Sequence, residues 1–259
     1  MVKSWGFIGG GRVTRIILGG LNRAGRLPRE VAVSDMDREA LERLKGLFPS
    51  IETIPGDNRR AASRDIVVLA VHYPVVAQVL EEIKDHLKEE ALLLSFAPRF
   101  TINGISQLLG GFDRIVRMVP NAPSLVNMGY NPVAFSPAIP EEERQELLDT
   151  FQALGECPQV QEEKLEAYVI ITGMGPTYFW FQWAELLEIA RELGLNPKEG
   201  EEAILHMLTG AIRALYQSGL APEEVMDLIP ARPLAQEEEG IKRAFRERLI
   251  ATFRKLKGE

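Results

Sequence analysis

A glycine-rich segment near the N-terminus has residue types that suit phosphate binding. It reads GFIGGGRVT over residues 6–14, follows an apolar run typical of a strand, and opens an amphipathic run typical of a helix. In the spacing Gly9-x-Gly11-x-x-Thr14, the first glycine permits a tight turn and the second lets the backbone approach a pyrophosphate at the helix N-terminus. Thr14 stands where glycine or alanine is usual, so we expect looser packing of helix on strand but an intact phosphate site. The segment predicts a dinucleotide-binding turn, and a turn without a ligand is the alternative.

An acidic residue ends the second predicted strand, in the sequence VAVSDMDR. Asp35 lies at about the separation from the glycine turn at which an acid binds the hydroxyls of the adenosine ribose. Its carboxylate would repel the 2′-phosphate of NADP, which favours NAD. However, Arg12 and Arg38 are close enough in sequence to pair with that phosphate, so the predicted cofactor is NAD(P)H. A helix N-cap is the alternative role for Asp35, with Asp37 as a solvated neighbour.

One histidine is a candidate for proton transfer. His72 directly follows an apolar run whose end we expect beside the reactive ring of the cofactor, and imidazole titrates near neutral pH. A hydrogen bond to the local backbone is the alternative. No His, Asp or Glu cluster has metal-ligand spacing and no serine lies in a nucleophile elbow, so we predict no metal and no acyl transfer.

The elements that carry these residues can be predicted from two kinds of sequence pattern. Up to about residue 160, short apolar runs alternate with amphipathic stretches, as in βαβ units around a parallel sheet. From about Lys164 onward only helical periodicity remains. We therefore predict an α/β fold with a Rossmann doubly wound sheet in domain 1–160 and an all-helical domain in 161–259. Strands are predicted at 4–8, 31–34, 66–71, 91–95, 115–118 and 133–136, and helices at 13–23, 38–47, 73–86, 101–109, 140–154, 176–193, 197–217, 222–228 and 239–257.

Composition excludes several classes of function. The chain has 259 residues, enough for two domains, with 46% hydrophobic and 26% charged residues. Its formal net charge of −7 argues against nucleic acid or an anionic membrane as a partner. Cys157 is the single cysteine, so an internal disulfide is impossible and a reducing cytoplasm fits. Neither a membrane-spanning apolar stretch nor a signal peptide is evident.

Five segments together resemble the pyrroline-5-carboxylate reductase family in order and spacing. They are GFIGGGRVT, DN at 57–58, VLAV at 68–71, RMVPNAPSLVNMG at 117–129 and TGMGPTY at 172–178. The resemblance runs to about Leu228 and continues weakly through the last helix. It implies an N-terminal domain that binds NAD(P)H and a helical C-terminal domain that forms an intertwined homodimer or larger homo-oligomer. It also implies hydride transfer to a cyclic imine that carries a carboxylate, giving proline.

The resemblance and the chemistry of the residues together assign roles to individual positions. The cofactor-binding set is Gly9, Gly11, Arg12, Val13, Ser34, Asp35, Asn58, Ala70, Val71 and Asn121; the catalytic set is His72, Thr172 and Gln236; and the substrate-binding set is Met174, Gly175, Thr177 and Arg232.

The main departure from the family lies in the segment DLIPARPLAQEEEGI, residues 227–241. The family has a Gly-Gly-Thr-Thr loop here that holds the substrate carboxylate, and this chain has neither the glycines nor the threonines. Pro233 has no backbone N–H to donate. Arg232, the lone cation in an otherwise apolar loop, is a candidate carboxylate ligand because a guanidinium offers a bidentate fork, and a solvated surface cation is the alternative.

This departure leaves other functions open. The chain could act on a different substrate, or it could be a non-catalytic dinucleotide-binding protein, although the retained RMVPNAP and TGMGPTY segments favour an enzyme. A reductase of the deazaflavin type or a 3-hydroxyacid dehydrogenase would share only the Rossmann half. We also expect the cluster FWFQW at 179–183 to form helix core and dimer packing, and Glu162 and Glu163 to lie on a solvated face.

Overall fold

The computed structural model describes residues 3–259 and divides the chain into two compact units. The first, here called the sheet unit, contains the chain up to Met174 together with Thr252–Glu259. The second, the helical unit, is Gly175–Ala251. Helix α11 (Glu238–Lys257) contributes residues to both units.

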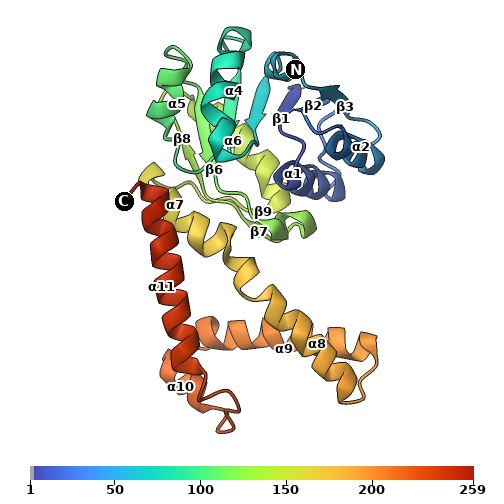
Figure 1. Cartoon of the computed structure of the whole chain (residues 1–259), viewed down its shortest axis with the longest axis vertical. Helices are drawn as coiled ribbons and strands as arrows, with labels where there is room; N and C mark the ends of the chain where they lie inside the picture. The colour runs from blue at the N-terminus through green and yellow to red at the C-terminus, as the bar shows by residue number, and fades with distance from the viewer. Residues whose placement is uncertain (1–2) are drawn as a thin grey trace. The chain divides into compact units, whose positions relative to one another are not determined.

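A seven-stranded sheet forms the centre of the sheet unit, in the order β3-β2-β1-β4-β5-β6-β8 (Figure 1). All neighbouring strands are parallel except β8, which pairs antiparallel with β6. Strand order reverses between β1 and β4, which is where open α/β sheets bind ligands at the carboxyl ends of their strands. The strands are β1 (Trp5–Ile8), β2 (Val31–Asp35), β3 (Glu52–Pro55), β4 (Ile66–Leu69), β5 (Leu92–Ser95), β6 (Ile115–Met118) and β8 (Val133–Phe135).

Helices cover both faces of this sheet, because alternate strand residues point to opposite faces and both sets are apolar. In β1, Phe7 belongs to the core shared with α1, α2 and α6, whereas Ile8 belongs to the core shared with α3, α4 and α5. The helices are α1 (Arg12–Arg23), α2 (Arg38–Leu47), α3 (Asn58–Ala62), α4 (Val76–Ile83), α5 (Ile102–Leu108) and α6 (Glu141–Phe151).

Irregular segments complete the sheet unit. A 3₁₀ turn, η3 (Ala122–Val126), follows β6, and two short strands, β7 (Gly129–Tyr130) and β9 (Gly155–Glu156), pair with each other. Near the end of the unit, the 3₁₀ turn η5 (Glu162–Lys164) and helix α7 (Leu165–Tyr168) lead into a π-helical turn, η6 (Val169–Gly173). Such turns occur frequently at functional sites.

The helical unit contains α8 (Trp180–Glu192), α9 (Pro197–Gln217), α10 (Pro222–Asp227) and most of α11. Helix α9 starts at a capping box in which the Asn196 side chain accepts from Glu199 N and the Glu199 carboxylate accepts from Asn196 N. Many large apolar side chains of this unit are exposed, including Phe181 at 68% and Tyr216 at 78%. A single copy therefore leaves much of the apolar surface of these helices in water.

The predicted fold class is confirmed, and the six predicted strands correspond to β1, β2, β4, β5, β6 and β8. In a single copy Trp180 and Phe181 of the FWFQW segment are exposed, so they do not belong to its core, and their packing in a dimer stays a prediction. We predicted the domain boundary near residue 160, and the structure keeps η5, α7 and η6 with the sheet unit. Within the described residues, no helix combines the length and apolar character needed to cross a membrane.

Candidate functional site

The glycine turn lies at the carboxyl end of β1, between β2 and β4. Gly9 has φ +105°, and its N–H donates to the Ser34 carbonyl at 2.8 Å. A Cβ on Gly9 would lie 2.5 Å from the carbonyl oxygen of Ala70 and would also crowd Val71. Glycine is required here both by the positive φ and by the close approach of the segment that follows β4.

Thr14 stabilises this turn. Its side chain is fully buried and its hydroxyl donates to the Gly9 carbonyl oxygen at 2.5 Å. The hydroxyl therefore ties the first turn of α1 to the glycine turn, and looser packing of helix on strand stays a prediction.

The N-terminus of α1 suits a pyrophosphate. Gly11 is its N-cap residue, with ordinary φ of −78°, and within the described chain no side chain caps the helix. A Cβ on Gly11 would meet no atom within 4 Å, so neither backbone strain nor protein packing requires glycine here. Arg12 and Val13 follow in the first turn, where backbone N–H groups lack helical acceptors. Open space over uncapped N–H groups is the arrangement that an anion at a helix N-terminus needs.

Asp35 connects the end of β2 to the glycine turn. One carboxylate oxygen accepts from Gly10 N at 2.6 Å and the other accepts from Asp37 N at 2.8 Å. Asp35 is not the N-cap of α2: that role belongs to Asp37, whose side chain accepts from Glu39 N and Ala40 N. The alternative role considered for Asp35 is therefore wrong, whereas Asp37 is solvated as expected, with a side chain that is 56% exposed.

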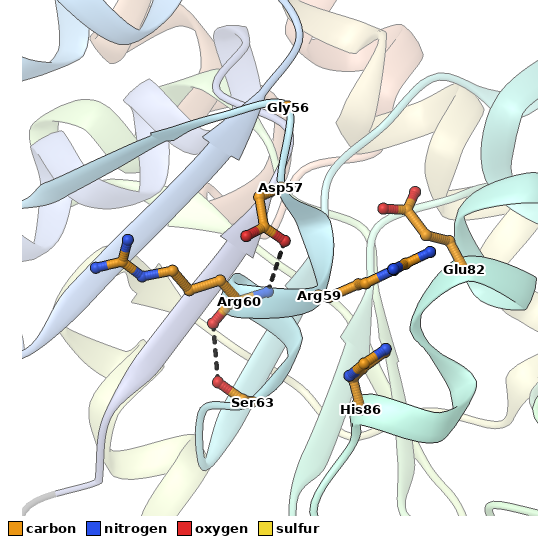
Figure 2. Close-up of a pocket in the computed structure, with 7 residues that line it drawn as sticks. All are labelled: Gly56, Asp57, Arg59, Arg60, Ser63, Glu82 and His86. Atoms are coloured by element: carbon orange, nitrogen blue, oxygen red, sulfur yellow. Dashed lines mark hydrogen bonds between the residues drawn. The ribbon is translucent and has the colours of Figure 1, made fainter.

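A chain of side-chain hydrogen bonds extends from β2 to α4. The buried Ser34 hydroxyl donates to Asn58 Oδ1 at 2.8 Å, and Asn58 Nδ2 donates to Glu82 Oε2 at 2.9 Å. Glu82 also lines a cavity of about 630 Å³ beside α3. Figure 2 shows Arg59 pointing toward Glu82 and His86, whereas Arg60, which pairs with Glu52, points to the other side.

The segment after β4 holds three predicted site residues. Ala70 N donates to the Ile8 carbonyl at 2.8 Å, which fixes Ala70 and Val71 against the glycine turn. His72 is exposed and its carbonyl accepts from Val75 N at 3.1 Å. The structure thus brings Gly9, Ser34, Asp35, Asn58 and this segment together around the carboxyl ends of β1, β2 and β4.

Asn121 lies between two parts of the sheet unit. Its side-chain oxygen accepts from Tyr130 N at 3.1 Å, and its amide nitrogen is 3.5 Å from the Thr172 carbonyl oxygen in η6. The Thr172 hydroxyl donates to the Tyr168 carbonyl at 2.9 Å. At Gly173, a Cβ would lie 3.2 Å from a methyl of Val119, so η6 packs closely on the loop that carries Asn121. Met174, which closes the π-turn by donating its N–H to the Val169 carbonyl at 2.9 Å, ends the sheet unit.

A buried ion network supports this region, and the sequence patterns did not reveal it. The Arg117 guanidinium, 4% exposed, donates to Glu162 at 2.8 Å and to Glu166 at 2.7 Å. Lys257 in α11 lies 3.7 Å from Glu166 and donates to the Glu163 carbonyl at 2.9 Å. Burial raises the pKa of Glu166, but the hydrogen bond and charge of Arg117 outweigh it and hold that pKa below its ordinary value. The expectation that Glu162 is merely solvated is wrong, since it also accepts from Ile102 N at 2.6 Å.

The remaining predicted residues lie in the helical unit. Gly175 is buried and Thr177 exposed in the 3₁₀ turn Gly175–Tyr178, whereas Arg232 and Gln236 are exposed in the segment before α11. The Arg232 guanidinium donates to Glu238 at 2.5 Å. Arg232 is therefore paired with the first residue of α11, and its role toward a substrate stays a prediction.

Sequence comparisons agree with this geometry. The family model described as "NADP oxidoreductase coenzyme F420-dependent" matches residues 4–99, within the sheet unit. The pyrroline-5-carboxylate reductase of Escherichia coli (strain K12) is 28% identical over 231 residues, covering 88% of this chain and 85% of the relative. That of Methanosarcina acetivorans is 25% identical over 260 residues, covering 97% and 96%.

Solved structures extend the agreement to the whole fold. A pyrroline-5-carboxylate reductase from Coxiella burnetii is 28% identical, with a TM-score of 0.74 over 100% of this chain and 98% of that one. Plasmodium falciparum pyrroline carboxylate reductase, crystallised with NADP bound, has a TM-score of 0.84 at 20% identity, over 99% and 97%. With its glycine turn, its RMVPNAP segment and its helical C-terminal part, this chain is similar to the pyrroline-5-carboxylate reductases over nearly its whole length.

Proposed function

We propose that this protein is an NAD(P)H-dependent reductase of a cyclic imine, converting pyrroline-5-carboxylate to proline. The observation that carries the proposal is the uncapped N-terminus of α1 beneath the open space at Gly11, at the switch point of the sheet. The family relatives supply the reaction, since they are named for it.

The proposed cofactor role of the sheet unit follows from its contacts. When bound, NAD(P)H supplies a hydride from its nicotinamide ring. The first-turn N–H groups of α1 would hold the pyrophosphate, and Asp35 would accept hydrogen bonds from the ribose. Ala70, Val71 and Asn121 would border the nicotinamide end. Because Ala70 and Val71 are already tied to the glycine turn, the protein contributes mainly by orienting the two reacting atoms.

Proton transfer needs a second group, and His72 is our candidate. Its side chain is exposed at the end of β4 and makes no hydrogen bond to another described residue, which leaves it free to reach the imine nitrogen. Thr172 would act as an acceptor, since its own hydroxyl hydrogen is directed to the Tyr168 carbonyl. An oxygen acceptor orients a protonated imine N–H without consuming its proton.

The substrate carboxylate requires a cation or backbone donors, and the loop before α11 lacks the glycines of the family. We propose Arg232 for this role, with Met174, Gly175 and Thr177 as further substrate-binding residues and Gln236 as a catalytic one, as the family resemblance implies. Because Arg232 is paired with Glu238, binding would exchange one carboxylate partner for another. This exchange predicts a weaker grip on the substrate carboxylate than a preformed ring of N–H donors would give.

We further propose a homodimer or larger homo-oligomer in the cytoplasm. The helical unit exposes Phe181, Leu193, Tyr216 and Ile229 at two thirds or more of their surface, which is more apolar surface than one copy can cover. A second copy of the same helices is the occupant that the family resemblance implies. Light scattering on the purified chain should give at least twice the monomer mass of 28.9 kDa, and a monomer at micromolar concentration would contradict this proposal.

The function is tested by turnover. Purified protein is mixed with NADH or NADPH and with pyrroline-5-carboxylate or a panel of other cyclic imines, and oxidation of the nucleotide is followed by absorbance. We expect oxidation that depends on both partners, with pyrroline-5-carboxylate the best substrate. Tight nucleotide binding without turnover of any imine would instead favour the non-catalytic dinucleotide-binding protein, consistent with the altered loop at 227–241.

A further inference from the structure

The end of β2 presents a carboxylate whose position is fixed by two loops. Asp35 accepts from Gly10 N in the glycine turn at 2.6 Å and from Asp37 N in the turn to α2 at 2.8 Å. The backbone of Asp35 is held as well, because its carbonyl accepts from Gly56 N at 2.9 Å after β3. Three segments therefore hold this side chain and backbone, and the carboxylate cannot turn away from a ligand without breaking contacts of the glycine turn itself.

This fixed carboxylate still has accepting capacity. An ionised carboxylate offers about four lone-pair sites, and the two backbone N–H groups use two of them. The ribose of NAD has 2′- and 3′-hydroxyls that can donate to the others. In NADP the 2′-hydroxyl is replaced by a phosphate dianion, which has no proton to donate and is repelled by the carboxylate.

The cations around Asp35 do not offset this repulsion. A second carboxylate, Asp37, follows within two residues, and Arg43 is already shared between Asp37 at 3.6 Å and Glu39 at 3.4 Å. On α3, Arg59 points toward Glu82 and His86 (Figure 2) and Arg60 pairs with Glu52.

Arg12 and Arg38 remain as cations without an ion pair among the described residues, and both are exposed. They stand at the first positions of α1 and α2, each within three residues of a loop that contacts the Asp35 carboxylate. These exposed side chains would have to be ordered from solvent to reach a 2′-phosphate, at a cost in side-chain entropy, whereas the Asp35 carboxylate is already held at the end of β2.

We propose that Asp35 is a specificity-determining residue that makes this protein bind NAD(H) in preference to NADP(H). The inference rests on the proposed dinucleotide function and goes beyond it by choosing between the two nucleotides. It assigns Asp35 two roles, orientation of the glycine turn through Gly10 and rejection of a 2′-phosphate through its charge. The two roles are separable. Loss of the first lowers the affinity for both nucleotides alike, and loss of the second changes only the ratio of the two affinities.

The test is direct binding without substrate. Dissociation constants for NADH and NADPH are measured by titration calorimetry at one fixed ionic strength, for the wild-type chain, for Asp35→Asn and for Glu39→Gln. The Glu39 variant removes the same charge from an exposed carboxylate in the first turn of α2, and serves as the control for long-range electrostatics. For the wild type we expect NADH to bind at least about tenfold more tightly than NADPH.

For Asp35→Asn we expect the ratio to fall to about threefold or less, whatever the loss in NADH affinity, and for Glu39→Gln we expect it to stay within about twofold of wild type. Equal or tighter binding of NADPH by the wild type would overturn the inference, as would an unchanged ratio in Asp35→Asn or an equal shift in Glu39→Gln. Failure of the wild-type protein to bind either nucleotide would overturn the proposed function together with this inference. If the wild type binds NADH but binds NADPH equally or more tightly, only the inference is overturned.

Discussion

Replacement of Arg117 by methionine tests the buried ion network that supports the candidate site. The side chain of Arg117 is 4% exposed and that of Glu166 is 7% exposed. Arg117→Met keeps most of the apolar length of the side chain but removes both charge-assisted hydrogen bonds, the one to Glu162 and the one to Glu166. Glu166 then remains as a buried carboxylate whose nearest cation is Lys257 at 3.7 Å.

The expected loss in the free energy of unfolding depends on the charges that Arg117→Met leaves unpaired. Removal of one partner of a buried pair costs about 3–5 kcal/mol, because the other charge stays out of water without compensation. Glu162 is 28% exposed and can regain water, and Lys257 compensates part of the Glu166 charge. We therefore expect a loss near the lower end, about 3 kcal/mol in the free energy of unfolding at neutral pH.

The loss should depend on pH with a definite sign. In the wild type, the pKa of Glu166 is held below its ordinary value, so its ion pair stabilises the fold above the unfolded pKa and is lost as pH falls through the folded one. In Arg117→Met, burial dominates and raises the pKa of Glu166, and protonation at acid pH relieves the buried charge. The difference between wild type and variant should therefore be widest near neutral pH, and it should narrow as pH falls first through the raised pKa of Glu166 in the variant and then through its lowered pKa in the wild type.

Urea unfolding, followed by circular dichroism at one protein concentration, measures this difference. The double variant Arg117→Met with Glu166→Gln should be more stable than Arg117→Met alone, because it no longer buries an unpaired charge. Glu163→Gln, in the exposed neighbour, is the matched control and should change the free energy of unfolding by less than about 0.5 kcal/mol. A stability of Arg117→Met within about 0.5 kcal/mol of wild type, or a difference that widens in acid, would refute the reasoning.

Three further outcomes are expected. Gly9→Ala should lower both the free energy of unfolding and the affinity for NAD(H), because Gly9 has a positive φ and a carbonyl oxygen lies close to it. Gly11→Ala should keep the free energy of unfolding within about 0.5 kcal/mol of wild type but lose affinity for the nucleotide. If the two variants behaved alike in urea unfolding and in titration calorimetry, this distinction would be contradicted. Asp65→Asn should lower the free energy of unfolding by about 1 kcal/mol at neutral pH after allowance for solvent screening, because Lys88 and the N–H and hydroxyl of Ser4 lower the pKa of Asp65 from 3.8 to about 2. Unfolding measured across pH should show this loss fading as pH falls from 3.8 to about 2. A loss that stays constant with pH would count against this reasoning. Burial raises the pKa of Cys157 to about 12, so its thiol should react with a disulfide reagent at mildly alkaline pH only after unfolding, and rapid labelling of the folded chain would be inconsistent with that burial.

The sheet could be predicted from the sequence because its strands are short, apolar and regularly spaced. β3 and α3 escaped prediction because Glu52–Pro55 and Asn58–Ala62 are brief and polar, and their structure depends on pairing with β2 and packing against β1. The same holds for η6, where TGMG interrupts a helical pattern but gives no sign of a π-turn. Tertiary contacts determine such segments, and local periodicity does not record them.

In the candidate site, too, some features could be predicted from the sequence and others depend on tertiary contacts. Spacing and chemistry located the glycine turn and Asp35, since each stands at a predicted strand end, whereas Asn58 was identified only through the family resemblance. Sequence patterns could not distinguish which of two neighbouring aspartates caps α2, because both types and positions suit a cap. The partners of Arg117 come from residues far along the chain, and the pairing of Arg232 with Glu238 depends on the fold of the loop between them.

The central claim is that this protein reduces pyrroline-5-carboxylate with a nicotinamide nucleotide. The most direct measurement quantifies the proline formed by the purified protein from pyrroline-5-carboxylate and NADH, alongside the NADH consumed. We expect equal amounts of proline formed and NADH oxidised, with both lost when protein, nucleotide or imine is omitted. Nucleotide binding without formation of proline would contradict it.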